Sequence, residues 1–324
     1  MHLRVFFLTS IKINYILNLI LNFFWKMIVL MSLKGYFMKK IAIVTDSNAG
    51  ILPSEVQGRD IFILPMPFLI DGEEYFEGIN LSQSEFYEKL EGNANVSTSQ
   101  PSSASVTELW DKVLKEYEQI IYIPMSSSLS ASCENATRLS EEYKDKVFVV
   151  DNQKISVIHK SSVFDAEKMA LEGKSANEIV QYLNETKFDS SIYIMVPNLK
   201  YLKKGGRLTP AAAMIGSLLN IKPVLQIQGG KLDSFAKVLS VKNALKTMIK
   251  AMKQDLEKRF QDFVDKDKFE IYVAYTKLEE DAMQFKEQVE SELGLKVSFV
   301  DPLSLSVACH IGPGALAIAG ARRY

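Results

Sequence analysis

The chain of 324 residues contains few of the residues that hold metals or form disulfides. It has two cysteines, Cys133 and Cys309, and three histidines, His2, His159 and His310. The cysteines lie far apart, and no Cys-x-x-Cys pair or His/Cys cluster occurs, which disfavours a zinc site. So few cysteines are typical of a reducing compartment. We therefore expect no metal, no other cofactor and a cytoplasmic location.

The chain also lacks the common motifs for binding nucleotides and for covalent catalysis. There is no GxxxxGK[ST], no GxSxG, and no GxGxxG after the first expected strand. The 38 basic and 39 acidic residues give a net charge of −1, so no overall field indicates a nucleic-acid partner. Beyond residue 37, only His159 and His310 are available as a histidine base. These absences argue against a chain that performs covalent chemistry alone.

Residues 1–37 differ in composition from the rest. The stretch 13–31 is apolar and aromatic, but three asparagines and Lys26 interrupt it, and polar groups are costly in lipid. No small-residue cleavage site follows, so a cleaved signal peptide fits poorly. "MKKIAIVTDS" at 38–47 is typical of the start of a bacterial α/β protein. We expect 1–37 to be an over-extended start, with a hydrophobic membrane anchor or a peripheral amphipathic element as alternatives.

From residue 39 onward, short apolar runs alternate with helical patterns, which predicts an α/β fold. The expected strands are 39–46, 60–70, 119–124, 146–151, 191–196, 268–276 and 296–300. The expected helices are 84–91, 105–118, 131–143, 162–172, 175–186, 210–220, 241–263 and 278–293. Near-continuous apolar strands predict a mostly parallel sheet in the first half. The segment 224–238, with Gly229-Gly230 at its centre, predicts a hairpin.

We expect two lobes, with a boundary near 187–191. The first is an N-terminal α/β lobe over 38–190, and the second is an α/β lobe over 191–324 that also contains the hairpin. Ligands of such folds bind at the carboxyl ends of strands and often between lobes. The polar residues that follow the strands are therefore the first candidates for a site.

Three hydroxyl-rich segments lie at strand ends, and the second of them is expected as a loop that leads into a helix. They are "TDSNAGI" at 45–51, "VSTSQPSSAS" at 96–105 and "QIIYIPMSSSLSAS" at 119–132. A helix N-terminus has unpaired N–H groups, and serines beside it add donors, so such a segment can bind a carboxylate or a phosphate. Plain helix capping is the alternative for each segment taken singly. A shared anion site requires that the three converge.

The second half contains two further candidates. Arg207 follows Gly205-Gly206 in "KKGGRLTP" and could reach into a cleft, although a solvated arginine is the alternative. His310 precedes a Gly-Pro-Gly turn, where glycines allow a close approach of the backbone to a ligand, although a structural histidine is the alternative. Close helix packing is expected for the small residues Ala211, Ala212, Ala213 and Gly216.

These segments, in this order, resemble the DegV family of bacterial lipid-binding proteins. The matching pieces are "IAIVTDSNAGI" (41–51), "TSQPS" (98–102), "SSSLSAS" (126–132), "LKKGGRLT" (202–209), "IKPVLQIQGGKL" (221–232) and "HIGPGALAI" (310–318). The resemblance extends from about residue 39 to the C-terminus. Six ordered motifs make it specific, whereas none of them would be specific alone.

The resemblance implies a two-lobed DegV-like fold with a long-chain fatty acid buried between the lobes. Hydroxyls of the TSQPS and SSxLS motifs, together with the histidine, would bind its carboxylate. The corresponding residues are Thr98, Ser99, Ser126, Ser127, Ser128 and His310.

In better-studied members of the family, a separate ATP-binding fatty-acid kinase converts the bound fatty acid to acyl phosphate for phospholipid synthesis. The resemblance assigns support of that phosphotransfer to Arg207 and His310. This chain would then be the binding subunit, not an enzyme by itself. The implied location is the cytoplasm or the inner face of the membrane, with transient membrane contact.

Three positions depart from the usual pattern of the family. Residues 129–132 read Leu-Ser-Ala-Ser in place of Leu-Ser-Gly-Thr. Asp151-Asn152 replaces the common Asp-Ser, and His159-Lys160 replaces a stretch of small residues. These changes bear on acyl-chain preference and partner docking. The alternative function is a stand-alone enzyme on a small acyl or anionic substrate, with Ser127 or Thr98 and His310 as its catalytic groups.

Overall fold

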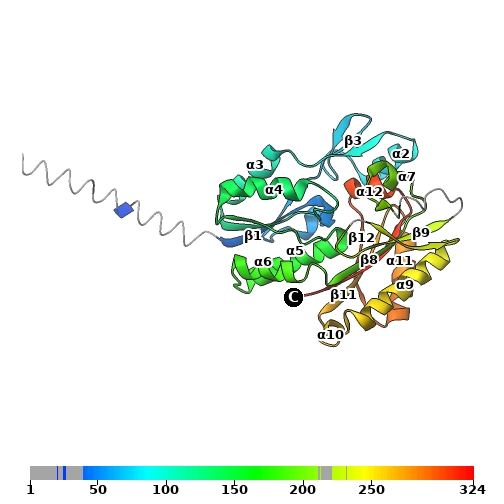
Figure 1. Ribbon diagram of the computed structural model, residues 1–324. Helices are drawn as coiled ribbons and strands as arrows, with labels where there is room; N and C mark the ends of the chain where they lie inside the picture. Colours follow the sequence, from blue (N-terminus) through cyan, green and yellow to red (C-terminus); the bar gives the residue numbers. More distant parts are fainter. Residues whose placement is uncertain (1–19, 21–24, 27–38, 211, 213–220, 231) are drawn as a thin grey trace, which may run out of the picture.

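The computed structural model describes residues 20, 25–26, 39–210, 212, 221–230 and 232–324 (Figure 1). The expected leader over 1–37 and the expected helix over 210–220 fall almost entirely outside these described residues. Among the short helices of the described part are η1 (Ser47–Ala49), η2 (Pro53–Glu55), η3 (Glu141–Tyr143) and α7 (Lys200–Gly205).

The first sheet is parallel throughout, as the apolar strands predict. Its order is β2 (Ile61–Leu64), β1 (Lys39–Asp46), β6 (Tyr117–Ile123) and β7 (Val147–Val149). Helices α3 (Ser103–Val113) and α4 (Ser132–Ser140) cover one face, and α5 (Ser156–Leu171) and α6 (Ala176–Glu185) cover the other. Ile41 and Ile43 face α5 and α6, whereas Ala42 and Val44 face α3 and α4. Both faces are therefore buried, which explains the unbroken apolar pattern.

The expected strand over 60–70 is wrong as a single element. Pro65 and Pro67 interrupt it, and proline has no N–H to donate to a strand ladder. The second part forms a separate antiparallel sheet in the order β4 (Glu73–Tyr75), β3 (Phe68–Ile70) and β5 (Val96–Thr98). With α2 (Gln83–Glu91), this sheet packs its apolar side chains against α12 (Leu305–Ile311). The segment around Thr98, expected as a loop, is thus held by a strand and a helix.

The second sheet has six strands and mixed directions. Its order is β10 (Asp233–Val238), β9 (Lys222–Ile227), β8 (Ser190–Met195), β13 (Leu316–Arg322), β11 (Phe269–Tyr275) and β12 (Val297–Pro302). The β11–β12 pair is parallel and the other pairs are antiparallel. The expected hairpin is confirmed as β9–β10, and Gly229 has the positive φ of 84° that its turn requires. β13 was not predicted from the sequence, because its Ala- and Gly-rich run contains a single β-branched residue, Ile318, and such residues are typical of strands.

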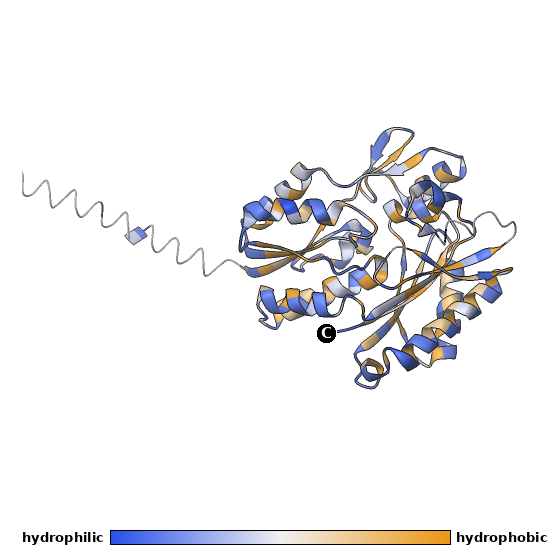
Figure 2. Ribbon diagram, in the orientation of Figure 1, coloured by the Kyte–Doolittle hydropathy of each residue, from blue (hydrophilic) through white to orange (hydrophobic). Residues whose placement is uncertain are grey.

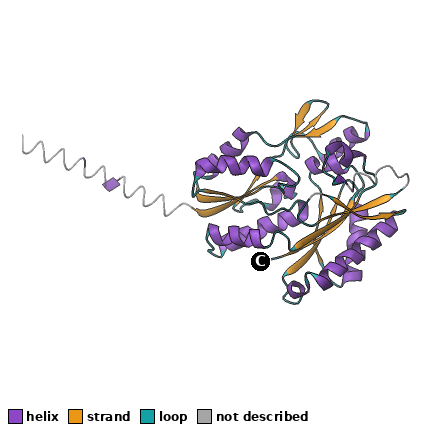
Figure 3. Cartoon of the chain, in the orientation of Figure 1, coloured by secondary structure: helices purple, strands orange, loops and turns teal. Residues whose placement is uncertain are grey.

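Helices cover one outer face of the second sheet. They are α9 (Val241–Lys258), the short α10 (Gln261–Val264) and α11 (Glu279–Leu293), so the helix expected over 241–263 is two elements. Figure 3 shows these helices on the side of the sheet away from the first lobe of the fold. The connection from α6 to β8 spans the residues where the lobe boundary is expected.

Helix α5 lies between the two sheets and is buried on both sides (Figure 2). Val163 and Ala166 pack with the first sheet, whereas Val157 and Ile158 pack in a core with residues of the second sheet. A helix enclosed in this way does not need one apolar face and one polar face. This explains why the sequence pattern predicted only 162–172, although the helix begins at Ser156.

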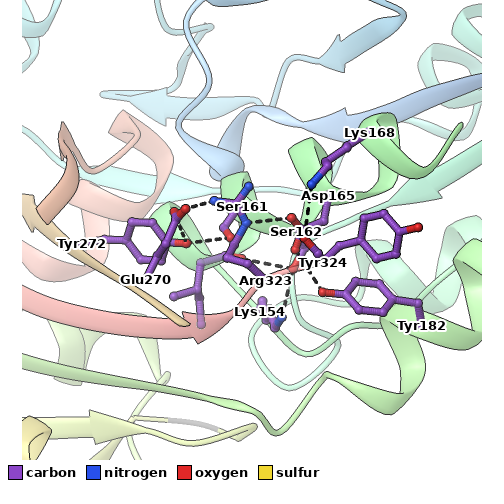
Figure 4. A network of polar contacts seen from close by, with 11 residues as sticks. Lys154, Ser161, Ser162, Asp165, Lys168, Tyr182, Glu270, Tyr272, Arg323 and Tyr324 are labelled. Atoms are coloured by element: carbon purple, nitrogen blue, oxygen red, sulfur yellow. Dashed lines mark hydrogen bonds and ion pairs between the residues drawn. The ribbon is translucent and has the colours of Figure 1, made fainter. Parts of the chain in front are cut away.

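Charged and hydroxyl side chains are buried around α5 (Figure 4). Asp165 accepts hydrogen bonds from Arg323 Nε at 2.7 Å and from the Tyr182 hydroxyl at 3.2 Å. The Lys154 amine donates to Ser162 Oγ at 3.0 Å. We call the following residues the α5 cluster: Lys154, Ser161, Ser162, Asp165, Tyr182, Glu270, Tyr272 and Arg323.

Candidate ligand cavity

A cavity of about 240 Å³ is lined by residues from segments that follow strands of the first sheet, from the small sheet, α7, α12 and the β9–β10 region. Its wall is largely apolar and includes Met66, Leu129, Ile155, Leu202, Leu232 and Ile311. Polar side chains on the same cavity include Asn48, Thr98, Ser99, Ser130, Arg207 and His310. An apolar pocket with a few polar groups is the usual form of a site for an amphipathic small molecule.

The structure brings all three hydroxyl-rich segments to this cavity. Asn48 follows β1, Thr98 and Ser99 lie at the end of β5, and Ser130 follows β6. These positions are far apart in sequence but adjacent in space, because β1 and β6 end at the same edge of the first sheet and β5 of the small sheet ends at the same cavity. The convergence that a shared anion site requires is therefore present.

Thr98 and His310 form a direct pair in the cavity wall. Thr98 Oγ1 lies 2.9 Å from His310 Nε2, which is a hydrogen-bond distance. Pairing of β5 with β3 holds Thr98 opposite Phe68, and α12 carries His310 against β5. Burial, and secondly the Arg207 charge, lower the pKa of His310 to about 4. The imidazole is therefore neutral at neutral pH.

Gly205 makes room for the His310 ring. A Cβ atom at this glycine would lie 2.0 Å from His310 Nδ1, closer than real Cβ contacts allow. The glycine in the KKGGR segment is thus required by the close approach of α7 to α12.

Arg207 is half-buried and has only neutral hydrogen-bond acceptors. Its Nε donates to the Leu129 carbonyl at 3.3 Å, and its Nη1 donates to the Gly205 carbonyl at 2.5 Å. Among the described residues, no carboxylate lies within ion-pair distance of its guanidinium. The arginine therefore presents an uncompensated positive charge to the cavity, and an anionic ligand can provide the missing counter-charge.

The three serines at 126–128 do not line the cavity. Ser126 is buried, and its Oγ accepts from the Ser128 N–H at 3.2 Å. Ser127 is exposed, and its hydroxyl donates to Asp151 Oδ2 at 2.5 Å. The serine of this segment that lines the cavity is instead Ser130, which lies in the turn just before α4 begins at Ser132.

Sequence reasoning did not assign a role to Asn48 or Ser306. Asn48 is buried, donates to Met125 Sδ at 2.8 Å, and accepts from the Ser304 hydroxyl at 3.1 Å and from Ser306. Asn48 lies within the TDSNAGI motif, so the motif could have identified it as a cavity residue. Ser306 lies in no motif, and only the position of α12 reveals it.

No helix in the described ranges is long and apolar enough to cross a membrane. Within the same ranges, no group of three His, Cys, Asp or Glu side chains is arranged to hold a metal ion.

Comparisons with known proteins agree with this geometry. A family model described as "Uncharacterised protein, DegV family" matches residues 40–323. A DegV domain-containing protein of Clostridium perfringens is 34% identical over 289 residues, which cover 87% of this chain and 97% of that protein.

Several solved structures share the fold. One reports fatty-acid binding by a DegV family protein from Thermus thermophilus, with a TM-score of 0.79, 26% identity, and coverage of 87% of this chain and 99% of that one. A fatty acid-binding DegV family protein from Streptococcus agalactiae has a TM-score of 0.78 and 28% identity, and the alignment covers 88% of this chain and 99% of that one. DegV from Bacillus subtilis, described as a fatty acid-binding protein, has a TM-score of 0.77 and 27% identity, and the alignment covers 88% of this chain and 100% of that one.

Proposed function

This chain belongs to the DegV family, and we propose that it binds a long-chain fatty acid in the cavity between its two sheets. The observation that carries the proposal is the combination of an apolar wall with the uncompensated Arg207 and the neutral Thr98–His310 pair. Solved relatives described as fatty acid-binding proteins support the same ligand class.

The two parts of the cavity would bind the two parts of the ligand. Burial of apolar surface contributes roughly 0.8 kcal/mol per CH₂, so a C16 chain gains on the order of 10 kcal/mol before the costs of binding. The carboxylate would accept a hydrogen bond from the Thr98 hydroxyl. His310 Nε2–H would then donate to Thr98 Oγ1, which is consistent with a neutral imidazole.

We further propose that the chain presents this carboxylate to a separate ATP-dependent fatty-acid kinase and carries the acyl-phosphate product. A carboxylate oxygen would attack the γ-phosphorus of ATP, the bond to the β–γ bridging oxygen would break, and ADP would leave. Arg207 would bind oxygens of the transferred group, since a guanidinium suits phosphate geometry. The absence of a common nucleotide-binding motif in the sequence supports placing ATP on the partner.

Mass spectrometry of an organic extract of the purified protein tests the ligand class. We expect about one free fatty acid per chain, or uptake of one when palmitate is supplied to delipidated protein. An empty extract with no uptake would contradict fatty-acid binding. The alternative enzyme would instead hydrolyse an ester of a small acid, and that turnover would be lost in His310→Ala.

Replacement of Arg207 tests the role in phosphotransfer. We expect Arg207→Ala to retain bound fatty acid, because burial of the acyl chain supplies most of the affinity. Acyl phosphate formed with ATP and the kinase should fall by about tenfold or more. Lys203→Ala is the matched control, because Lys203 is exposed and does not line the cavity. Unchanged product formation by Arg207→Ala would refute the role assigned to Arg207.

A further inference from the structure

A second cavity, of about 140 Å³, shares a wall with the ligand cavity. Thr98, Arg207 and His310 line both cavities, so these three side chains form the partition between them. Beyond the partition, the lining includes Ser97, Tyr201 and Lys204. We call this second space the outer cavity. A single water needs roughly 10–15 Å³, so the outer cavity can hold a group of several heavy atoms.

The outer cavity is positively charged. Lys204 Nζ donates to the amide oxygen of Asn95 at 2.5 Å, and Arg207 donates only to backbone carbonyls. In the described ranges, neither cation has a carboxylate at ion-pair distance. The stretches outside those ranges contain no Asp or Glu at all, so they supply no counter-charge. Two cations without an acid favour an anionic occupant.

The position of the cavity indicates which anion this is. A carboxylate bound at the Thr98–His310 pair lies on the partition, so one of its oxygens can face the outer cavity. Lys204 is exposed, and the outer cavity is therefore accessible from the surface at this residue. A phosphoryl donor held by a second protein can approach the carboxylate from this side without crossing the apolar wall.

We propose that the outer cavity binds the phosphoryl group of the acyl phosphate, with Lys204 as a second cationic ligand beside Arg207. The inference rests on the proposed function, because the phosphoryl group reaches this space only through a carboxylate bound on the partition. The new bond joins that carboxylate oxygen to the γ-phosphorus of a nucleoside triphosphate on the partner. The broken bond is the one from this phosphorus to the β–γ bridging oxygen, whose electron pair leaves with the diphosphate.

The test compares two probes that share one acyl chain. Palmitate and the non-hydrolysable palmitoyl phosphonate are titrated separately into the delipidated full chain, and the ratio of their dissociation constants is measured. We expect the wild type to prefer the phosphonate. Lys204→Met should reduce that preference by about tenfold or more, because it removes one charge-assisted hydrogen bond to the phosphonate. Palmitate affinity should remain unchanged.

Two further variants serve as controls. Lys203→Met removes a neighbouring exposed charge that does not line the outer cavity, and Lys204→Arg keeps the charge. Both should retain the preference for the phosphonate. Equal loss in Lys203→Met, or no loss in Lys204→Met, would overturn the assignment of Lys204.

The remaining outcomes separate the two proposals. Failure of the wild type to bind palmitate would refute the proposed function itself. Palmitate binding without any preference for the phosphonate would refute the outer cavity alone. Inorganic phosphate that binds the lipid-free protein as tightly as the phosphonate does would assign the space to a free anion, and would likewise overturn the proposal.

Discussion

Two regions of the protein hold cations that are at least partly buried, and they differ in whether an acid lies beside the cation. In the α5 cluster, Arg323 meets both Asp165 and Glu270 (Figure 4). On α5 itself, Lys160 Nζ lies 2.7 Å from Glu55 Oε1 and 2.7 Å from Asp301 Oδ2. In the cavity, Arg207 meets two backbone carbonyls and no acid of the described residues.

This difference indicates a structural role for the paired cations and a ligand-binding role for the unpaired one. Buried charges are costly unless they are paired, so a cluster that supplies its own counter-charges needs nothing from outside and can join two sheets permanently. A cation left with neutral partners retains part of that cost, and a ligand with the opposite charge can recover it. Arg323 of the α5 cluster thus has two acids of the protein beside it, whereas Arg207 in the partition between the two cavities has no acid beside it among the described residues.

The largest expected effect comes from breaking the Arg323–Asp165 ion pair. Asp165→Asn removes the buried acid and leaves Arg323 with Glu270 alone, and we expect a loss of about 3 kcal/mol in the free energy of unfolding, measured by urea denaturation. Arg207→Met should change the same quantity by only about 1 kcal/mol, because no buried acid loses its partner. Similar losses in the two variants would contradict the distinction between the regions.

A smaller effect concerns Lys154, whose cation is only partly compensated within the cluster. Burial lowers the pKa of this lysine to about 8, against opposing charges on Asp165 and Asp189 that raise it. The folded state therefore loses the proton near pH 8, while the unfolded chain keeps it to about pH 10.4. Since the unfolded state binds more protons in this window, stability should rise with pH.

The Lys154→Met variant isolates this contribution. Relative to the variant, the wild type should gain about 1–2 kcal/mol in the free energy of unfolding between pH 8 and about pH 9.5. The comparison is needed because the two buried cysteines, with pKa values raised to about 12, act in the opposite direction above their ordinary pKa. A constant difference between the two proteins over this range would show that Lys154 stays protonated in the folded state.

The smallest expected effect is a change in the pKa of His310 in the cavity wall. The Arg207 charge contributes to the low pKa of His310, but burial contributes more. Arg207→Met should therefore raise the pKa of His310 from about 4 by up to about one unit, as measured by NMR titration of the ring protons. His159, which is held by Thr45 and the Ile123 carbonyl, is the internal control and should not change. An unaltered His310 would mean that the Arg207 charge is already neutralised.

The sequence predicted those parts of the fold that local pattern determines. The parallel sheet and the β9–β10 hairpin follow from apolar runs and from the Gly229-Gly230 turn. Pairing over long distances was not predictable. β13 joins β8 and β11 through small residues with little strand preference, and β5 is recognisable only beside β3. Helix α5 lacked a periodic signal because both of its sides are buried.

The candidate site was predicted by motif and refined by geometry. Thr98, Ser99, Arg207 and His310 lie on the cavity, as the resemblance implies, whereas Ser127 turns away to Asp151. The sequence cannot show which of several neighbouring serines lines the cavity, because they are the same residue type. Their positions in the turn before α4 determine that it is Ser130. The roles of all these residues stay predictions until ligand binding is measured.

The place of β13 also bears on how the protein is made. The first sheet has all its strands by residue 149, so it can form while synthesis continues. The second sheet cannot close until β13 leaves the ribosome, because this strand lies between β8 and β11 and follows all the other described strands in chain order. His310 precedes β13 by only a few residues. A nascent chain thus carries a complete first sheet while the second sheet, and the cavity wall that His310 belongs to, remain open until β13 has been made.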